Sequence, residues 1–489
     1  MSFKKVVTPT LYLCVAMLCL AGITSCSDKD KTHTVDDVAT IDNGIVEDAP
    51  LVWADRTYMD AVISEAEKIN ADDYTSASYS QFVKVYGETL AVETDTLAEQ
   101  ETLDAAAAKL EAAIEILEKK ADLSEIHALK ARIDRMDKSL YTPSSLEHFT
   151  KNVDSIMAGV KDDISQKAAD TLVNSLKSAI GNLVAIPLDT GKKGSYVNCS
   201  AFPVRADGKE FEMSAETEKE FRRIATSRFG FGYFVLDLQT GANLTYNADT
   251  EFFQASTAKA QFCLFMYNLI DKGEASFDDE LVFQKKHASV GSGEIKETPY
   301  GSVYKLDYLI EKALTISDNC AFHMMVDGYD YRKYNAFIKS LGCKYAGEVE
   351  PGAHFGYSSP RDTIKIWSEI YTYTRYGANG TQFRRHLENS AYNSVGDGIP
   401  EYSVAHKSGW TSAQFNDFAI VYAPHPYLIV TYLTVKDGSE RKIVENFSAA
   451  TKKVMDEYHA FMYENEDIYL PEAPVPEELA EESQDKSNN

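Results

Sequence analysis

The stretch Phe253-Gln254-Ala255-Ser256-Thr257-Ala258-Lys259-Ala260-Gln261-Phe262 decides how this chain is organised. Ser256 and Lys259 stand three residues apart, so a helix that begins at the serine places both side chains on one face. A serine hydroxyl is a weak nucleophile until a neighbouring base takes its proton, and a lysine accepts that proton once burial has lowered its pKa. The residues from Ala260 to Ile270 are mostly apolar on every side of such a helix. They predict a buried helix whose first turn presents Ser256 to a cleft.

Two later motifs distinguish this pair from other Ser-x-x-Lys occurrences in the chain, such as those at positions 2–5 and 439–442. Ser317-Asp318-Asn319 begins 61 residues after Ser256, and Lys407-Ser408-Gly409 begins 90 residues after Ser317. In this order the three motifs resemble the serine β-lactamase and penicillin-binding-protein superfamily, class A β-lactamases most closely. Further stretches within residues 210–465 resemble class A sequence at the expected places: Gly241 to Asp249, Gly291-Ser292-Gly293-Glu294-Ile295, Pro360-Arg361-Asp362-Thr363 and Phe415-Asn416-Asp417-Phe418-Ala419-Ile420-Val421.

The resemblance implies an α+β domain over residues 195–468, and the residue patterns agree with it. In this fold an antiparallel sheet is flanked by helices and carries an inserted all-helical subdomain, as in β-lactamases and transpeptidases. Apolar periodicity predicts helices over 213–229, 306–321, 331–341 and 441–463, a hairpin over 233–246, and strands at 403–407, 418–422 and 427–433. The acidic, proline- and glutamate-rich residues 469–489 are predicted to be a disordered tail.

Composition and charge narrow the choice of partners. At about 150 residues per domain, the 489 residues predict about three domains. The formal charge of −26 argues against nucleic acid or an anionic membrane surface as a partner. The chain has no Cys-x-x-Cys pair and no closely spaced histidines, so we expect neither a metal site nor a cofactor. Cys263 and Cys320, close to the motifs, are interpreted as small core residues.

The first residues have the features of an export signal. Lys4-Lys5 precede an apolar run over residues 6–22, and small residues lead to Cys26. The cysteine after small residues resembles a bacterial lipoprotein box, which implies a signal peptide over 1–25, lipidation of Cys26 and anchoring in the outer membrane, on its periplasmic or surface side. An ordinary signal peptide cleaved elsewhere is the alternative. Residues 26–50 lack apolar periodicity and are predicted to be a linker.

Residues 51–120 and 121–187 repeat one pattern. Tyr74-Thr75 recurs 67 residues later as Tyr141-Thr142, and each copy carries apolar residues at helical spacing. Each is predicted to form a three-helix bundle. The pattern resembles FIVAR modules of bacterial surface proteins, which implies a spacer or a weak carbohydrate contact. We favour the spacer, because aromatic residues at helical spacing are usually core.

Resemblance to class A enzymes assigns catalytic roles to four residues of the motifs. Ser256 is the acylated nucleophile, and Lys259 is its general base or a proton relay. Ser317 passes a proton to the departing nitrogen. Lys407 supplies a fixed positive charge for Ser317 and for the substrate carboxylate. Taken singly, Ser-Asp-Asn is also typical of a helix-capping turn and Lys-Ser-Gly of a strand end.

The same resemblance assigns substrate binding to Asn319, Ser408, Gly409 and Trp410. Asn319 holds the amide side chain of the substrate, and Ser408 hydrogen-bonds its carboxylate. The backbone N–H groups of Ser256 and Trp410 form the oxyanion hole, whose donors are each typically worth about 10²–10³ in rate. Trp410 departs from the family pattern by its size. A large residue beside the oxyanion strand is expected to narrow the cleft.

Hydrolysis of the acyl-enzyme requires a base for the attacking water. Class A enzymes use the glutamate of a Glu-Pro-x-x-Asn loop. This chain has Glu350-Pro351-Gly352-Ala353-His354, in which His354 replaces the asparagine that helps to hold the water. Glu350 is the predicted base, Glu348 competes with it, and a solvated loop carboxylate is the alternative for both.

These observations predict an exported, lipid-anchored serine hydrolase that opens the β-lactam amide through an acyl-enzyme at Ser256. One alternative is a D-alanyl-D-alanine peptidase or other cell-wall amide hydrolase that β-lactams only acylate, so that its substrate is a peptidoglycan peptide. A second alternative is a surface or glycan-binding protein whose hydrolase fold is inactive. The sequence gives no indication of the oligomeric state.

Overall fold

A computed structural model describes residues 53–189, 199–228, 230–346, 354–465 and 468–473. The predicted signal peptide, the linker, Cys26 and Glu350 lie outside the described residues. Across the described ranges, none of the helices combines the length and the hydropathy needed to span a bilayer.

Each N-terminal repeat folds as three α-helices with one short 3₁₀ turn. The first contains α1 (Thr57–Ala66), η1 (Ala71–Asp73), α2 (Ser76–Glu93) and α3 (Gln100–Glu115). The second contains α4 (Ser124–Arg135), η2 (Lys138–Leu140), α5 (Pro143–Ala158) and α6 (Gln166–Gly181). Equivalent threonines begin the middle helices, because Thr75 accepts a hydrogen bond from the amide of Ser78 and Thr142 from that of Ser145.

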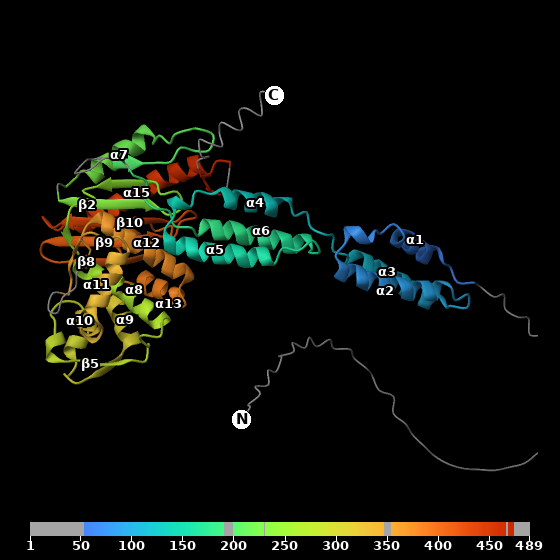
Figure 1. The fold of residues 1–489 in the computed structure, drawn as a ribbon, viewed down its shortest axis with the longest axis horizontal. Coiled ribbons are helices and arrows are strands. Elements are labelled where there is room, and N and C mark those ends of the chain that lie inside the picture. The colour runs from blue at the N-terminus through green and yellow to red at the C-terminus, as the bar shows by residue number, and fades with distance from the viewer. Residues whose placement is uncertain (1–52, 190–198, 229, 347–353, 466–467, 474–489) are drawn as a thin grey trace, which may run out of the picture. The chain divides into compact units, whose positions relative to one another are not determined.

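A six-stranded antiparallel sheet forms the centre of the C-terminal domain (Figure 1), in the order β1-β3-β2-β10-β9-β8. Its strands are β1 (Cys199–Ala201), β2 (Phe231–Asp237), β3 (Asn243–Tyr246), β8 (Val404–Trp410), β9 (Gln414–Val421) and β10 (Tyr427–Thr434). The predicted hairpin is β2–β3, and the three predicted C-terminal strands are β8, β9 and β10. The short edge strand β1 was not predicted. As the last strand of the order, β8 has one free edge.

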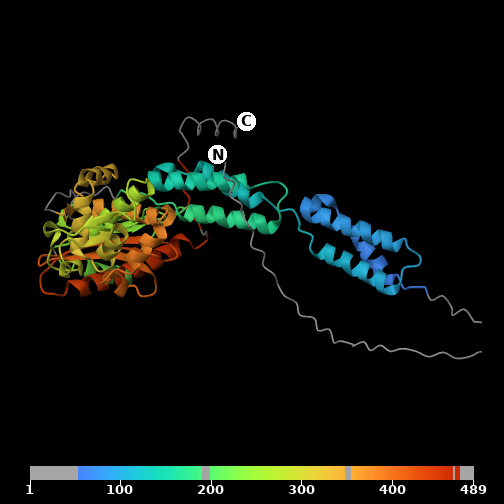
Figure 2. The same ribbon diagram turned by 90° about the horizontal axis from the view of Figure 1, so that it is seen from below.

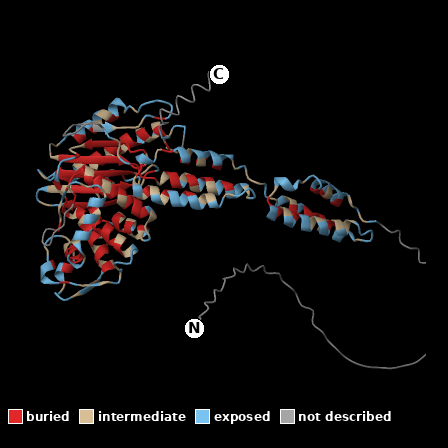
Figure 3. Cartoon of the chain, in the orientation of Figure 1, coloured by how far each residue is buried: buried red, intermediate tan, exposed pale blue. Residues whose placement is uncertain are grey.

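Helices cover both faces of this sheet. Side chains alternate between the faces along a strand. Phe234 and Leu236 therefore join a core with α8 (Ala258–Asp271), α9 (Leu306–Thr315), α10 (Asn319–Gly328) and α12 (Pro360–Tyr376). Tyr233 and Val235 join a second core with α7 (Ala215–Ala225) and α15 (Glu440–Met462). Figures 2 and 3 show the helices and the buried residues gathered around the sheet.

The remaining elements belong to the segment inserted between β3 and β8. They are β4 (Phe252–Phe253) with β7 (Tyr357–Ser358), β5 (Glu280–Val282) with β6 (Val303–Lys305), η4 (Lys285–His287), η5 (Ile295–Glu297), α11 (Tyr331–Ser340), α13 (Gly380–Glu388) and α14 (Ser394–Asp397). The single helical stretch predicted over 306–321 is wrong. The chain leaves α9 at Thr315, turns through Ser317 at a φ of 60°, and begins α10 at Asn319.

The second repeat makes backbone contacts with the C-terminal domain. The amide of Ala185 donates to the carbonyl of Leu238 at 2.7 Å, and that of Leu188 donates to Gly241 at 2.9 Å. Val184 is fully buried in the same core as Phe234. The C-terminal chain also reaches this repeat, since Leu470 packs in its core and Asp137 donates to Pro471. These contacts fall at the start of the stretch predicted to be a tail, of which residues 474–489 lie outside the described part.

Candidate active site

Ser256 lies in a sharp turn at the start of a buried helix. It is the middle residue of η3 (Ala255–Thr257), which runs into α8, and 11 of the 14 residues of α8 are buried. Ala255, directly before the serine, has a φ of 50°, a left-handed conformation that non-glycine residues seldom adopt. Backbone strain of this kind is typical of functional sites and persists because the surroundings impose it. The half-buried Ser256 is therefore held at a fixed position at the end of an apolar helix.

Lys259 connects the first two motifs directly. Its fully buried ammonium lies 3.1 Å from the hydroxyl of Ser256 and 3.1 Å from that of Ser317. It also donates to the carbonyl of Ser317 at 2.6 Å and to the side-chain oxygen of Asn319 at 2.7 Å. Burial, followed by the charge of Lys407, lowers the pKa of Lys259 well below its ordinary value. A neutral Lys259 is correctly placed to take the proton of Ser256.

The Ser317-Asp318-Asn319 turn is held by a buried carboxylate. One oxygen of Asp318 accepts from the amide of Ala321 at the start of α10. The other accepts from the amides of Glu294 and Ile295 at 2.6 and 2.9 Å. Gly293 is required beside it, because a Cβ there would lie 2.2 Å from the Asp318 carboxyl carbon and the φ of 113° disfavours other residues. The capping role that sequence alone allows for Asp318 therefore coexists with a functional one, since the cap positions Ser317 and Asn319.

The third motif lies on the edge strand β8. Lys407 is almost fully buried and donates to the carbonyl of Ser408 at 2.8 Å. Burial lowers the pKa of Lys407 to about 8, and the Asp417 carboxylate opposes this shift. The hydroxyl of Ser408 donates to the carbonyl of Ala391 at 3.2 Å. To donate to a substrate carboxylate, as the sequence predicts, this hydroxyl has to rotate away from Ala391.

Gly409 brings β8 against the nucleophile. A Cβ at this position would lie 2.6 Å from the amide nitrogen of Ser256 and 2.7 Å from that of Thr257. The amide of Thr411 donates to the carbonyl of Gln414 across the hairpin. Opposed residues of antiparallel strands alternate between hydrogen-bonded and non-hydrogen-bonded pairs. Gly409 therefore bonds to β9, whereas the amide of Trp410 points out from the free edge. Both backbone donors predicted for the oxyanion hole thus belong to segments in contact, and one of them is directed away from the sheet.

Sequence analysis missed a buried histidine–aspartate pair that connects β8 to β9. His406 faces the carboxylate of Asp417 at 2.8 Å through Nδ1 and the carbonyl of Ser390 at 2.9 Å through Nε2. Asp417 also accepts from the amides of Ser394 and Val395. The pair fixes the segment over residues 390–395 to β8 and β9. The one available signal was Asp417 within the class A-like stretch that begins at Phe415.

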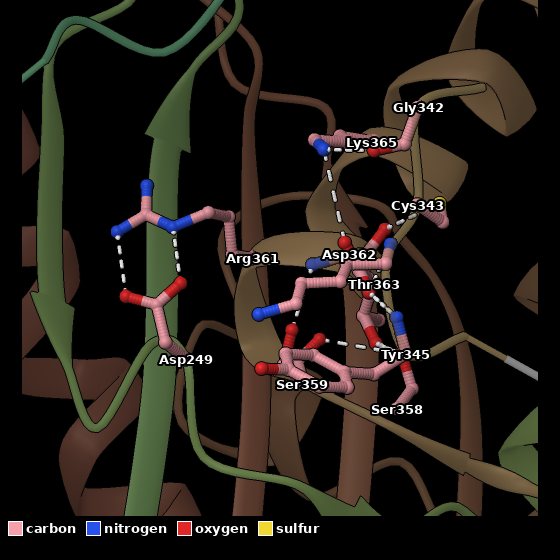
Figure 4. A network of polar contacts seen from close by, with 11 residues as sticks. Asp249, Gly342, Cys343, Tyr345, Ser358, Ser359, Arg361, Asp362, Thr363 and Lys365 are labelled. Atoms are coloured by element: carbon pink, nitrogen blue, oxygen red, sulfur yellow. Dashed lines mark hydrogen bonds and ion pairs between the residues drawn. The ribbon is translucent and has the colours of Figure 1, made fainter.

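Glu350 and its competitor Glu348 lie outside the described residues, but both flanks of their segment are well held. Asp362 accepts from the amides of Lys344 and Tyr345, and Ser359 caps α12 by accepting from Asp362 (Figure 4). On the other flank, the ring of His354 stacks on that of His323 at 3.9 Å. Within the described ranges, no group of three or more His, Cys, Asp or Glu side chains is placed to hold a metal ion.

Comparisons with known proteins find similarity to one family and to several solved structures. The sequence model of a family described as "Beta-lactamase2: Beta-lactamase enzyme family" matches residues 216–458, which run from α7 to α15 and contain all three motifs. The solved structure of PBP-A shares 18% identity over 50% of this chain and 97% of its own, with a TM-score of 0.46. A β-lactamase from Sphaerobacter thermophilus shares 18% identity over 49% and 97%, with a TM-score of 0.44. One from Chitinophaga pinensis shares 20% identity over 49% and 98%, with a TM-score of 0.45.

Proposed function

We propose that this chain is a serine hydrolase that opens β-lactam amides through an acyl-enzyme at Ser256. The observation that carries the proposal is the single ammonium of Lys259 within 3.1 Å of both the Ser256 and Ser317 hydroxyls. A lysine buried between two hydroxyls, with its pKa lowered, serves proton transfer better than it serves stability. The match of residues 216–458 to the β-lactamase family supports the same assignment.

Acylation uses groups that are already in contact. Lys259 takes the proton of Ser256 while the oxygen attacks the carbonyl carbon of the substrate amide. The amides of Ser256 and Trp410 stabilise the resulting oxyanion. When the carbon–nitrogen bond breaks, Ser317 donates a proton to the departing nitrogen and recovers one from Lys259, which returns the lysine to its neutral form. Lys407 provides the positive charge that attracts the substrate carboxylate.

Deacylation by water completes the proposed cycle, and we propose Glu350 as the base. It would take a proton from the water as the water attacks the ester carbon, and would pass that proton to the oxygen of Ser256 as the carbon–oxygen bond breaks. The second candidate is a peptidase-like hydrolase of cell-wall amides. β-Lactams acylate such an enzyme, and the acyl-enzyme is then hydrolysed only slowly. This candidate is favoured by His354, which stacks on His323 in a buried position instead of supplying the amide that the resemblance expects beside the water.

Intact-mass analysis after a short β-lactam pulse tests both candidates. We expect an adduct with the mass of the intact β-lactam, located on Ser256 after digestion and absent from Ser256→Ala. If the adduct disappears within one catalytic cycle in the parent and persists in Glu350→Gln, hydrolysis proceeds through that carboxylate. An adduct equally long-lived in both proteins supports the peptidase-like candidate. A parent that never forms an adduct, while a glycan pulldown retains it, would support a binding protein instead.

We also propose that the protein is exported and anchored through a lipid on Cys26. Lys4-Lys5, the apolar run over residues 6–22 and the small residues before Cys26 support this assignment. The helical repeats would then separate the hydrolase from the outer membrane. Metabolic labelling with an alkyne fatty acid should mark the full chain and leave Cys26→Ser unlabelled. Labelling of the serine variant to the same extent would contradict the anchor.

A further inference from the structure

Tyr392 has a strained backbone conformation that burial of its own side chain does not explain. It has a φ of 64°, in the left-handed region that bulky residues avoid, and its side chain is 54% exposed. Burial of the ring therefore does not compensate for the strain. The conformation is imposed by its neighbours, because Ala391 is bonded to Thr315 and Ser408, and residues 394 and 395 are bonded to Asp417. A strained exposed aromatic, fixed on both sides, is a reason to look for a function.

The ring of Tyr392 meets the ring of Trp410. Their centroids are 4.8 Å apart and the planes cross at 73°, an edge-to-face contact. Trp410 is itself 41% exposed. Because side chains alternate along β8, Trp410 projects from the same face as Ser408, while Lys407 and Gly409 project from the other. The aromatic pair Tyr392–Trp410 is thus exposed beside the hydroxyl that is expected to meet the substrate carboxylate.

We propose that the aromatic pair Tyr392–Trp410 selects acylating substrates that carry a flat aromatic or conjugated substituent on the carboxylate-bearing side of the scissile amide. This inference rests on the proposed acylation of Ser256. Exposed aromatic rings with an apolar face and few free torsions are the side chains that binding sites use as anchors. The amide of Trp410 belongs to the predicted oxyanion hole, so a group stacked on the indole lies next to the reacting carbonyl. The resemblance to class A enzymes assigns the opposite, acyl side of the substrate to Asn319.

Two cephems with the same side chain at C7 test the inference in the full-length protein. One carries a methyl group at C3 and the other an arylvinyl group. Their second-order acylation rate constants are measured by quenching and intact mass. Intrinsic reactivity differs between the two compounds, but it cancels when the arylvinyl-to-methyl rate ratio of a variant is divided by the ratio of the parent.

We expect Trp410→Ala and Tyr392→Asn each to lower that ratio by about 3- to 10-fold. Asparagine tolerates the left-handed backbone, so Tyr392→Asn removes the ring without forcing the loop to rearrange. Trp410→Phe and Tyr392→Phe keep a ring and should hold the ratio within about twofold of the parent.

An unchanged ratio in both ring-deleting variants would show that the pair only covers the edge of β8, and would overturn the inference. A ratio that rises in Trp410→Ala would overturn it too, because the indole would then merely narrow the cleft. A parent that forms no adduct with either cephem would overturn the proposed function itself, and that outcome is visible before any ratio is taken.

Discussion

The Nζ atom of Lys259 lies 3.1 Å from the Oγ atom of Ser256 at the buried start of α8. Burial lowers the pKa of this lysine, so its neutral form becomes available as pH rises through the lowered value. We expect Lys259→Met to slow acylation of Ser256 by about 10²- to 10⁴-fold, the usual worth of a positioned general base. The rising limb of the acylation rate against pH should disappear in this variant.

Lys272→Met is the matched control for this prediction, because Lys272 is exposed at the C-terminal end of the same helix. It should acylate like the parent across the whole pH range. Lys259→Met that keeps the parent's rate would remove the lysine from the mechanism.

Loss of the proton from Lys407 should produce a falling limb in the pH profile of kcat/KM. Burial lowers its pKa to about 8, so the side chain is charged below that pH and loses its proton above it. Attraction of a substrate carboxylate needs the charged form. We therefore expect kcat/KM for an anionic β-lactam to fall as pH rises through about 8, since this parameter reports the free enzyme. Lys407→Arg should move the fall to higher pH, because a guanidinium keeps its proton. A limb at the same pH in the arginine variant would assign it to another group.

Gly409 predicts a steric effect on the nucleophile. A Cβ here would lie 2.6 and 2.7 Å from the amide nitrogens of Ser256 and Thr257, and neither backbone can easily yield. Gly409→Ala should displace the oxyanion edge and slow acylation by about 10²- to 10³-fold, as loss of one donor does. Gly87→Ala is the control, because a Cβ there meets no atom within 4 Å. Parent-like acylation by Gly409→Ala would show that the contact is not tight.

The convergence of the motifs could be predicted from sequence, because their order and spacing resemble those of class A β-lactamases. Ser256, Lys259, Ser317 and Asn319 are brought into direct hydrogen-bond contact, and Lys407 is close enough for its charge to lower the pKa of Lys259. The strands around them were predicted because their apolar residues form short runs between turns. These features depend on local pattern or on a motif that is contiguous in the chain.

What could not be predicted depends on contacts between distant residues. The break at Ser317 interrupts a helical pattern, and it exists because Asp318 caps α10 while it also accepts from Glu294 and Ile295, 24 and 23 residues away. The pairing of His406 with Asp417 could not be predicted either, because the class A-like stretch that contains Asp417 does not indicate which residue its carboxylate contacts. The second repeat contacts the hydrolase through a backbone hydrogen bond of Ala185. Because every residue carries the same backbone groups, the sequence does not indicate such a contact.

Asp318 predicts a loss of both stability and rate when its charge is removed. The side chain of asparagine accepts a hydrogen bond at its oxygen but donates at its nitrogen. Asp318→Asn therefore leaves at least one of the three backbone N–H groups facing another N–H group. One unsatisfied buried group costs about 1–3 kcal/mol. Chemical denaturation should detect that loss, and acylation should slow because Ser317 and Asn319 move. Asp330→Asn is the control, since Asp330 caps α11 at an exposed position and asparagine caps equally well. Equal denaturation midpoints for the two variants would contradict the role of the buried carboxylate.

The two helical repeats should differ in how strongly they support the hydrolase. Leu110 and Leu176 are equivalent by repeat and both fully buried, so truncation of either to alanine should cost its bundle about 2–5 kcal/mol. The second bundle shares Val184 with the hydrolase core and bonds to Leu238 through Ala185. In calorimetry of the full chain, the hydrolase transition can be identified as the one that shifts when a β-lactam acylates the protein. We expect Leu176→Ala to lower this transition and Leu110→Ala to leave it unchanged. If both substitutions leave it in place, the second repeat is a spacer like the one predicted from sequence; if both lower it equally, the two repeats and the hydrolase unfold as one unit.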